Sequence, residues 1–518
     1  MSFSANDLSA AKARVAAVYD PAALEAAGTR VVSLLSDHFR EVGSRDAKVL
    51  NWTDPSTAVQ LARQQLKNAS AQIPLPFREG QGEGSATNSP FTPLTKRLTD
   101  LTRDSLARGQ NLHHPRYVGH QVPAPVPLAG LFDLVGTITN QCMAIYEMGP
   151  WATAVEHAVI AEVGERLGFP AGQFAGLVTS GGSVANLTGL LTARNVTLGN
   201  AWSTGLAGRS PAPVLIAQAD AHYSVTRSAG ILGLGTNQII LAALDRRRRM
   251  DPNQLEETLR ELRTKGVPVI AVSAAACATP IGAFDPLADV ADVCARHEVW
   301  MHVDAAHGGA LAFSERHRHL LAGIERADSV ICDAHKMMFM PALCAMLFYK
   351  NREHRIATFH QDAPYLFDPT APELRDYDSG IVNLECTKRS AAFGLWGTWS
   401  LLGPQIFADM VDVTIDLAQK FHAMLEAADD FETLHVPQCN IVAFRYVPRE
   451  LKDVPLEKLD AFQLQLRRAV IESGDFYFVQ SRIDGRPVLR TTMMNPLTTE
   501  DDLRALLDCL RRTAENLI

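Results

Sequence analysis

Long apolar runs are missing from this chain, and so are the signatures of several common protein classes. No apolar stretch approaches the length of a membrane span, which argues against a transmembrane helix. The N-terminus MSFSANDLSAAKARVAAVYD is amphipathic and carries acids early, unlike a signal peptide. There is no basic excess, because the formal net charge is −8, and so no electrostatic footprint for nucleic acid. The Gly-x4-Gly-Lys-Ser/Thr pattern that binds nucleoside triphosphates is also absent.

Paired cysteines are lacking as well. The eight cysteines are scattered, none forms a Cys-x-x-Cys pair, and several lie in predicted core strands. This usage is typical of free thiols in a reducing cytoplasm rather than of a disulfide framework. What is present is an ordinary globular composition over 518 residues, with 47% apolar and 20% charged residues. A chain of this length can form several units with cores of their own.

The most informative stretch runs from Val299 to Met338. It holds two short apolar runs, VWMHVD, which ends at Asp304, and DSVICDAHK, which leads to Lys336. Runs of this length followed by turn-forming residues are typical of buried strands in a parallel sheet. Ligands of open α/β sheets bind beyond the carboxyl ends of the strands. Both charged side chains are therefore expected at one ligand-binding edge.

An acid and a lysine at such an edge match the needs of pyridoxal 5′-phosphate (PLP). The PLP aldehyde needs a lysine for a Schiff base, and its ring nitrogen needs an acid that keeps it protonated. An arbitrary Asp–Lys pair is more often a structural salt bridge. The position of Asp304 and Lys336 at strand ends, and the motifs beside them, favour the cofactor.

These motifs, HVDAAHGG and DAHKMM, resemble the signatures of the group II PLP-dependent amino-acid decarboxylases, the family of glutamate, cysteine-sulfinate and aromatic-amino-acid decarboxylases. The resemblance runs from about His114 to the C-terminus. The segments SAAACATPIGAFDP and ADSV…AHKMM are most similar to the glutamate and cysteine-sulfinate branch. The resemblance implies an α/β protein of PLP-dependent transferase fold type I, which is aspartate-aminotransferase-like. Such a protein has a large domain with a mostly parallel central sheet.

Three domains follow from the resemblance together with the hydrophobic pattern. Residues 1–113 are expected to form an N-terminal helical dimerisation segment, and residues 114–385 a large PLP-binding domain with a mobile catalytic loop at about 357–384. Residues 386–518 are expected to form a small C-terminal α/β domain. Helical spacing predicts helices, among others, at 22–40, 56–70, 94–108, 128–153, 154–167, 251–265, 287–297 and 405–427. Strands are predicted at 214–219, 238–244, 267–275, 343–349, 441–446 and 488–492.

The resemblance also assigns the residues that would hold the cofactor. Lys336 corresponds to the Schiff-base lysine, and Asp304 to the acid at the ring nitrogen. His222, in AHYSVTRSAGILGLG, corresponds to a histidine that stacks on the ring and can relay a proton. The Gly-rich turn before a helix at Gly182 and Ser183 is expected to bind the phosphate. Thr279, His335 and Ala306 complete the expected cofactor neighbours.

Three further residues are expected to act on the substrate. Tyr365, in the Tyr-Leu-Phe of the expected mobile loop, matches a tyrosine that protonates the reaction intermediate. Arg490, in VLRTT, matches an arginine whose fixed fork can bind a carboxylate in two places. His120 belongs to HPRYVGHQ, which resembles a segment that lines the substrate pocket.

Several positions depart from the family pattern. Cys277-Ala278-Thr279 stands where the family usually has Gly-Thr-Thr, and His307 stands where it often has an aromatic or another bulky residue. Asp333 replaces an asparagine of the animal glutamate branch, with no clear chemical consequence. ECTKR (residues 385–389) replaces a QCGR-type run, which weakens any transfer of substrate preference.

The sequence thus predicts decarboxylation of an L-amino acid to its amine and CO2. A small acidic substrate is favoured, namely glutamate, aspartate or cysteine sulfinate, with 2,4-diaminobutyrate and aromatic amino acids left open. Transamination, carbon–carbon lyase chemistry and decarboxylation coupled to oxidation are the enzymatic alternatives, since one PLP fold hosts several reactions. A catalytically silent homologue and a metal site at His302, Asp304 and His307 are weaker alternatives. The expected assembly is a cytoplasmic homodimer with its active site near the interface.

Overall fold

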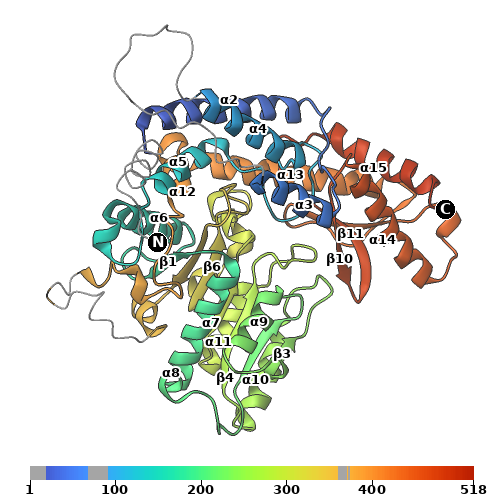
Figure 1. Ribbon diagram of the computed structural model, residues 1–518. Helices are drawn as coiled ribbons and strands as arrows, with labels where there is room; N and C mark the ends of the chain where they lie inside the picture. The colour runs from blue at the N-terminus through green and yellow to red at the C-terminus, as the bar shows by residue number, and fades with distance from the viewer. Residues whose placement is uncertain (1–18, 68–91, 360–369, 371–373) are drawn as a thin grey trace, which may run out of the picture. The chain divides into compact units, whose positions relative to one another are not determined.

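The computed structural model describes residues 19–67, 92–359, 370 and 374–518 of the chain (Figure 1). The chain divides into two compact units. The first takes in the described residues up to Tyr117 and also Arg468–Tyr477, and the second takes in Val118–Arg467 and Phe478–Ile518. The predicted division at residues 113/114 and 385/386 stays a prediction.

The first unit is helical, as its apolar spacing predicts. Its helices are α2 (Pro21–Gly43), α3 (Pro55–Lys67) and α4 (Thr92–Arg108), and α2 packs against α4. Asp20 caps α2 by accepting a hydrogen bond from the Ala22 N–H (2.9 Å), and Pro21 occupies the first helical position. The C-terminal part of α14 (Leu456–Ser473) also contributes to this unit.

The second unit is built on a mixed, mostly parallel sheet, which confirms the predicted α/β class. Among the described residues, seven strands take the order β1-β7-β6-β5-β4-β2-β3. The strand β7 is antiparallel to both of its neighbours, and the other pairings are parallel. The strands are β1 (Ala175–Thr179), β2 (Val214–Gln218), β3 (Ile239–Ala242), β4 (Val269–Ala275), β5 (Met301–Asp304), β6 (Ser329–Asp333) and β7 (Ala345–Tyr349).

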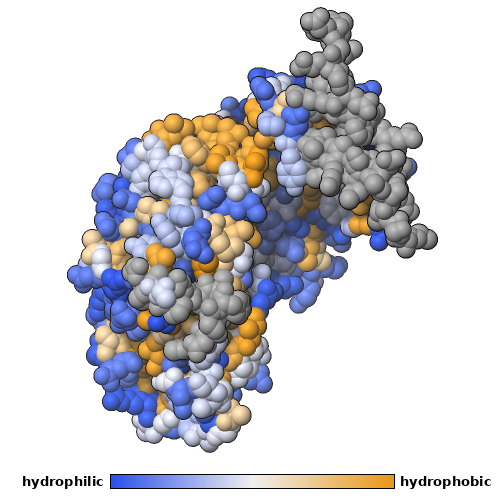
Figure 2. All heavy atoms as spheres, turned by 60° about the vertical axis from the view of Figure 1, so that its left-hand side comes forward, coloured by the Kyte–Doolittle hydropathy of each residue, from blue (hydrophilic) through white to orange (hydrophobic). Residues whose placement is uncertain are grey.

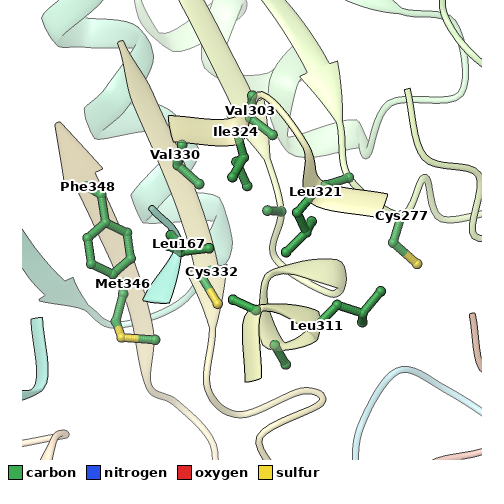
Figure 3. Close-up of a cluster of buried hydrophobic side chains, with 14 of the residues drawn as sticks. Leu167, Cys277, Val303, Leu311, Leu321, Ile324, Val330, Cys332, Met346 and Phe348 are labelled. Carbon is green, nitrogen blue, oxygen red and sulfur yellow. The ribbon is translucent and has the colours of Figure 1, made fainter. Parts of the chain in front are cut away.

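Helices cover both faces of this sheet. One face packs on α7 (Gly182–Leu198) and α9 (Tyr223–Ile231), and the other on α6 (Pro150–Arg166), α10 (Pro252–Thr264) and α11 (Leu287–His297). Because side chains alternate along a strand, Val303, Val330 and Phe348 all point into the core on the side of α6, α10 and α11, as Figure 3 shows. Their neighbours Ile331 and Leu347 pack on the α7 face. The side chains of His302 and Asp304 therefore lie on the α7 face as well.

A smaller antiparallel sheet completes the second unit. Among the described residues its strands take the order β10-β11-β9-β8, and α13 packs against β8, β9 and α15. The strands are β8 (Phe431–Thr433), β9 (Ile441–Tyr446), β10 (Val479–Ile483) and β11 (Arg486–Thr492). The remaining α-helices of the described residues are α5 (Pro127–Ile138), α8 (Ala201–Thr204), α12 (Phe393–Leu402), α13 (Gln405–Glu426) and α15 (Glu500–Glu515). Short 3-10 helices lie at Tyr146–Met148, Thr236–Gln238, Gly308–Phe313, Arg318–Leu321, Ile324–Arg326, Arg352–Ala357, Ser379–Ile381 and Arg449–Leu451.

One predicted helix, 128–153, is wrong in its second half. The helix α5 ends at Ile138, and α6 begins at Pro150. Between them Asn140 adopts a positive φ of 50°, and Cys142 forms an isolated bridge with Arg389. A side chain at Gly149 would place its Cβ 2.6 Å from the Cys142 carbonyl oxygen. The apolar residues between the helices continue the helical spacing, and this spacing led to the wrong prediction. They lie in the connection between α5 and α6 rather than on a helix face.

No helix within the described residues is both long and apolar enough to cross a bilayer.

Candidate functional site

A cavity of about 310 Å3 lies beyond the carboxyl ends of β4, β5 and β6, beside the N-terminus of α7. The location is the one expected for a ligand of an open α/β sheet. The structure brings most of the sequence-predicted residues together in its wall. Those that line the cavity are Gly182, Ser183, His222, Thr279, Asp304, Ala306, His335 and Lys336.

Three predicted residues are placed differently. His120 is exposed and does not line the cavity, although its neighbour Gln121 does. Arg490 stands just behind the wall, where its Nη1 donates to the Thr279 carbonyl oxygen at 2.6 Å. Tyr365 lies outside the described residues, as do all of residues 360–369 and 371–373 of the predicted mobile loop.

Asp304 ends β5 with both carboxylate oxygens engaged. Its Oδ1 accepts from the Ala306 backbone N–H at 3.1 Å, and its Oδ2 accepts from Asn186 Nδ2 at 2.9 Å. Asn186 is a buried residue of α7. The carboxylate is thus held at a fixed angle at the cavity wall, where an ionised acid can pair with a protonated ring nitrogen.

Lys336 meets an acid in the turn that follows β6. Its Nζ lies 3.3 Å from Asp333 Oδ2, and the Asp333 side chain is only 2% exposed. Burial by itself lowers the pKa of the Lys336 amine, but the charges of Asp333 and Asp304 outweigh burial and raise that pKa above its usual value. The amine is therefore an ammonium ion at neutral pH in the protein without cofactor.

The N-terminus of α7 opens onto the cavity through a glycine pair. Gly181 precedes the helix with a φ of 138°, a conformation that favours glycine. A Cβ at Gly182 would lie 2.7 Å from Asp333 Oδ2, so this position has no room for a side chain. The first amides of a helix have no intrahelical acceptor, and they can bind an anion such as a phosphate.

His222 caps the N-terminus of α9. Its Nδ1 lies 2.8 Å from Ser224 Oγ and also accepts from the Ser224 backbone N–H at 3.3 Å. Burial lowers the pKa of His222, the nearby Asp304 charge opposes that shift, and the net pKa lies below the usual value. The ring is therefore largely neutral at neutral pH, and the Nε2 nitrogen carries its single proton.

The loop after β4 differs from the glycine-containing family pattern. Cys277 adopts a positive φ of 84°, a conformation that costs free energy for a residue with a Cβ. Its Sγ lies 3.3 Å from Cys439 Sγ, and both thiols are buried. The cysteine therefore takes the backbone conformation of a glycine and is held there by packing.

Arg490, on β11, is 5% exposed. Burial lowers the pKa of its guanidinium to about 10, which still leaves it charged at neutral pH. Within the described part of the chain no carboxylate pairs with it, and its buried Nε lacks a hydrogen-bond partner. A buried charge without a counter-ion is costly, and it suits a site that receives an anionic ligand.

The residues once considered for a metal site have other partners. His302 bonds to Asn186 and Ser329, and His307 Nε2 bonds to Asn440 Oδ1 at 2.7 Å. Burial lowers the pKa of His302 to about 4 and that of His307 to about 3, so both imidazoles are neutral. Within the described residues no group of three or more His, Cys, Asp or Glu side chains is arranged to hold a metal ion.

The cavity fits the cofactor that the sequence suggests. Its volume is at the lower end of the range of small-molecule sites. Lys336 supplies the amine for the aldehyde, Asp304 a carboxylate for the ring nitrogen, and the glycine-walled start of α7 an anion site for the phosphate. These three groups belong to different elements, yet they face one space.

Sequence reasoning missed part of the site. It did not single out Asn186 or Ser224, and it gave Asp333 no chemical role, although Asp333 is the ion-pair partner of Lys336. One signal in the sequence pointed to the surroundings of Asp304: side chains alternate along β5, so His302 and Asp304 lie on the same face of the sheet. Lys388 of ECTKR does not line the cavity, since its Nζ binds the buried carboxylate of Glu156 at 2.5 and 2.8 Å.

Comparison with known proteins identifies a match over most of the chain. The family model described as "Pyridoxal-dependent decarboxylase conserved domain" matches residues 95–447. Among solved structures, mouse CSAD is 27% identical with a TM-score of 0.82, and the match covers 95% of this chain and 99% of that chain.

Two more distant structures share the fold. One is the glutamate decarboxylase domain of a diaminobutyrate-pyruvate transaminase and L-2,4-diaminobutyrate decarboxylase from Vibrio parahaemolyticus, at 23% identity and a TM-score of 0.77, over 95% of this chain and 96% of that chain. The other is Oryza sativa TDC with PLP and tryptamine, at 21% identity and a TM-score of 0.82, over 96% and 99%.

Proposed function

The chain belongs to the pyridoxal-dependent decarboxylase family and is a PLP-dependent amino-acid decarboxylase, and from that premise we propose that its substrate is a small L-amino acid with an acidic side chain. Glutamate, aspartate and cysteine sulfinate are the candidates. The observation that carries the proposal is Arg490, a buried guanidinium that lacks a carboxylate partner among the described residues. A second carboxylate or a sulfinate on the substrate would supply the missing negative charge.

Each cavity residue has a role that follows from its surroundings. When bound, PLP supplies an electron sink for the electron pair that remains as CO2 leaves. Lys336 would attach the cofactor between turnovers, and the amides at the start of α7 would hold its phosphate. Asp304, fixed by Asn186 and the Ala306 amide, would keep a proton on the ring nitrogen and so stabilise developing negative charge.

A proton must return to the substrate carbon after CO2 departs. We propose Tyr365 as its donor, because Tyr365-Leu366-Phe367 is similar to the glutamate branch of the family. His222 is the second candidate, since its neutral ring keeps a proton on Nε2 and lies in the cavity wall. Comparing kcat of the cofactor-loaded Tyr365→Phe and His222→Phe variants would separate the two, because loss of the proton donor lowers the rate of the loaded enzyme.

A diamino acid such as 2,4-diaminobutyrate is the second candidate substrate. His307 lines the cavity and donates from Nε2 to Asn440, and its buried Nδ1 is an acceptor that has no hydrogen-bond partner among the described residues. An amino group on the substrate could donate to this nitrogen. The fold is shared with the Vibrio parahaemolyticus structure named above.

We also propose that the enzyme is a homodimer. The helix α5 packs its Ala129 and Gly136 inward but exposes Leu128, Leu131, Leu134, Val135 and Ile138. A helix that is apolar all round needs cover on both sides. Figure 2 shows apolar side chains gathered in one area of the surface in that view. A second copy of the chain is the occupant that the family resemblance implies, and the eight free cysteines support a reducing, cytoplasmic location.

The substrate proposal is tested by screening amino acids for release of CO2 and amine, together with the visible spectrum of the cofactor-loaded enzyme. We expect turnover of an acidic amino acid, a visible cofactor band, and loss of both in Lys336→Ala. The exposed Lys265→Ala is the control and should keep both. In Arg490→Lys we expect KM for the acidic substrate to rise about tenfold or more, because one point charge replaces a two-pronged fork.

Each other outcome has a definite meaning. Turnover of a diamino or aromatic amino acid alone would overturn the acidic-substrate proposal and leave the decarboxylase intact. A cofactor band without CO2 from any candidate would indicate another PLP reaction. An unchanged KM in Arg490→Lys would remove the arginine from substrate binding.

A further inference from the structure

Behind the cavity wall lies a continuous chain of buried polar side chains. Trp300 Nε1 lies 2.9 Å from Ser329 Oγ, which lies 2.8 Å from His302 Nδ1, and His302 Nε2 lies 2.8 Å from Asn186 Oδ1. From Asn186 the chain branches, because its Nδ2 lies 2.9 Å from Asp304 Oδ2 and 2.9 Å from Ser224 Oγ. The second branch continues from Ser224 to His222. The chain therefore links both proposed ring-contacting residues, Asp304 and His222, to one buried histidine.

The orientation of Asn186 follows from its partners. An ionised carboxylate oxygen such as Asp304 Oδ2 can only accept hydrogen bonds, so the NH2 side of the Asn186 amide must face it. The carbonyl oxygen of Asn186 then faces His302 Nε2, which must carry a proton in order to donate. A flipped amide would bring a carbonyl oxygen against a carboxylate oxygen and leave two acceptors facing each other.

The protonation of His302 is then fixed. Its side chain is fully buried, and burial lowers its pKa to about 4, so it carries one proton rather than two. With that proton on Nε2, Nδ1 accepts a hydrogen bond from the hydroxyl of Ser329. The oxygen of Ser329 is left to accept from the indole of Trp300. Each donor in this arm points toward Asn186.

The arm through Ser224 has the same direction. The backbone N–H of Ser224 points at His222 Nδ1, so that nitrogen is an acceptor. The Ser224 hydroxyl can donate to the same nitrogen while its oxygen accepts from Asn186. The network thus delivers donors to Asp304 and to His222, and it takes no proton from either residue.

We propose that His302 and Asn186 are positioning residues, in which the Nε2–H of His302 locks the Asn186 amide so that it holds the Asp304 carboxylate and, through Ser224, the His222 tautomer toward the cofactor ring. The inference rests on the proposed placement of Asp304 and His222 at that ring. One buried imidazole would thus set the hydrogen bonding of both Asp304 and His222.

Packing gives an independent reason for the position of this imidazole. A Cβ at Gly189 of α7 would lie 3.0 Å from His302 Cε1 and 3.1 Å from His302 Nδ1. The absence of a side chain at Gly189 therefore leaves the space that the His302 ring occupies beside the helix. The position is built from two elements, because His302 comes from β5 and both Gly189 and Asn186 come from α7.

A purely structural role is the alternative, in which the network only holds α7 on the sheet. Three variants separate the two. His302→Phe keeps the ring and removes the donor, and His302→Gln can restore a donor near the Nε2 position. Val303→Ala, one residue along β5 and on its other face, removes packing without touching the network, and it serves as the control for lost stability.

The readouts are the dissociation constant for PLP, measured by adding PLP to the cofactor-free protein, and the pH dependence of the bound cofactor's visible band. We expect His302→Phe to weaken PLP binding about tenfold or more and to shift the pH profile, because the Asn186 amide loses its lock. His302→Gln should recover most of the affinity. Val303→Ala should lower the thermal midpoint but keep the affinity and the profile.

The tautomer itself can be measured without cofactor. In protein with 15N-labelled histidine, the cross-peaks of His302, assigned by their loss in His302→Gln, should show a neutral ring protonated at Nε2. A proton on Nδ1 would overturn the inference. So would a loss of PLP affinity in both His302→Phe and Val303→Ala that is proportional to the drop in their thermal midpoints. Failure of the unmodified protein to bind PLP at all would instead count against the cofactor placement, which distinguishes the two proposals.

Discussion

The charge on Lys336 is set by a residue three positions earlier in the same turn. The amine lies 3.3 Å from Asp333 Oδ2, and the carboxylates Asp333 and Asp304 together raise its pKa despite burial. Attack on an aldehyde requires the neutral amine. The protein without cofactor therefore stores this lysine in its unreactive, charged form, and attachment of the cofactor requires loss of a proton.

Replacement of Asp333 by asparagine should change the ratio of the charged to the neutral form of the Lys336 amine, with little change in the shape of the side chain at position 333. Removing the negative charge lowers the pKa of the Lys336 amine, so a larger fraction is neutral at a given pH. We expect the rate at which PLP attaches to the cofactor-free protein to rise at neutral pH, and the pH–rate curve to move toward lower pH. The measurement is the growth of the visible cofactor band after mixing, over a range of pH.

Asp328→Asn is the matched control, because Asp328 lies at the opposite end of β6 and does not line the cavity. Its curve should coincide with that of the unmodified protein. A curve for Asp333→Asn that stays in place, or moves toward higher pH, would show that Asp333 does not control the lysine.

At this scale the sequence predicted the chemistry better than the contacts. Asp304 and Lys336 could be placed at one edge because each ends a short apolar run, which local pattern reveals. The role of Asp333 could not be seen, since an acid three residues before a lysine has many geometries. The sequence suggested His302 only as a weak candidate for a metal ligand. Its true partner, Asn186, could not be predicted, because the two residues belong to different elements that only folding brings together.

At the scale of elements, the helices α5 and α12 pack closely through glycines. A Cβ at Gly397 of α12 would lie 2.2 Å from the Phe132 ring of α5, and one at Gly136 of α5 would lie 3.0 Å from Phe393 Cδ2 of α12. Neither glycine has a positive φ, so close approach is the reason for them. The aromatic ring of Phe132 also meets Trp396 edge-on, with centroids 6.1 Å apart.

Gly397→Ala should therefore destabilise the fold by about 3 kcal/mol, because overpacking outweighs the gain in helix propensity. Urea unfolding followed by circular dichroism measures the change. Gly230→Ala on α9 is the matched control, since its Cβ would meet only Thr236 Cγ2 at 3.9 Å. We expect it to be neutral or slightly stabilising. Equal effects of the two substitutions would contradict the packing argument.

The sequence predicted most of the helices and most strands of the larger sheet, because their apolar residues recur at helical or strand spacing. It failed between Ile138 and Pro150, where a turn with apolar residues continues the helical spacing of α5. The short strands β8 and β10 were not predicted, because β8 has three residues and β10 (VQSRI) has apolar residues only at its two ends. Their pairing partners, rather than their own composition, make them strands.

At the scale of the whole molecule, an apolar helix face that no other described residue covers predicts self-association. The positions 128, 131, 135 and 138 recur at helical spacing on α5, and each has an exposed apolar side chain. In a two-fold symmetric dimer each substitution on this face acts twice. The prediction concerns the proposed homodimer, which the sequence suggests only through family resemblance.

The double variant Leu131→Glu/Val135→Glu should weaken the dimer about 100-fold or more, because it places charges in an apolar interface. Sedimentation equilibrium over a range of concentrations measures the dissociation constant. Val436→Glu, at an exposed apolar residue in the loop between β8 and β9, should leave the dissociation constant unchanged. A monomeric unmodified protein, or a double variant that dimerises as before, would rule out this face as the interface.

The position of β1 in the sheet has a consequence for how the enzyme is made. In the described sheet β1 stands at the edge and pairs with β7 alone, and β7 ends at Tyr349. The proposed phosphate-binding turn follows β1 directly, so its anchor is absent while the ribosome is still translating the codons before Tyr349. A nascent chain therefore cannot assemble this turn as it emerges, and cofactor capture is a late event in biosynthesis, after more than half of the polypeptide has been made.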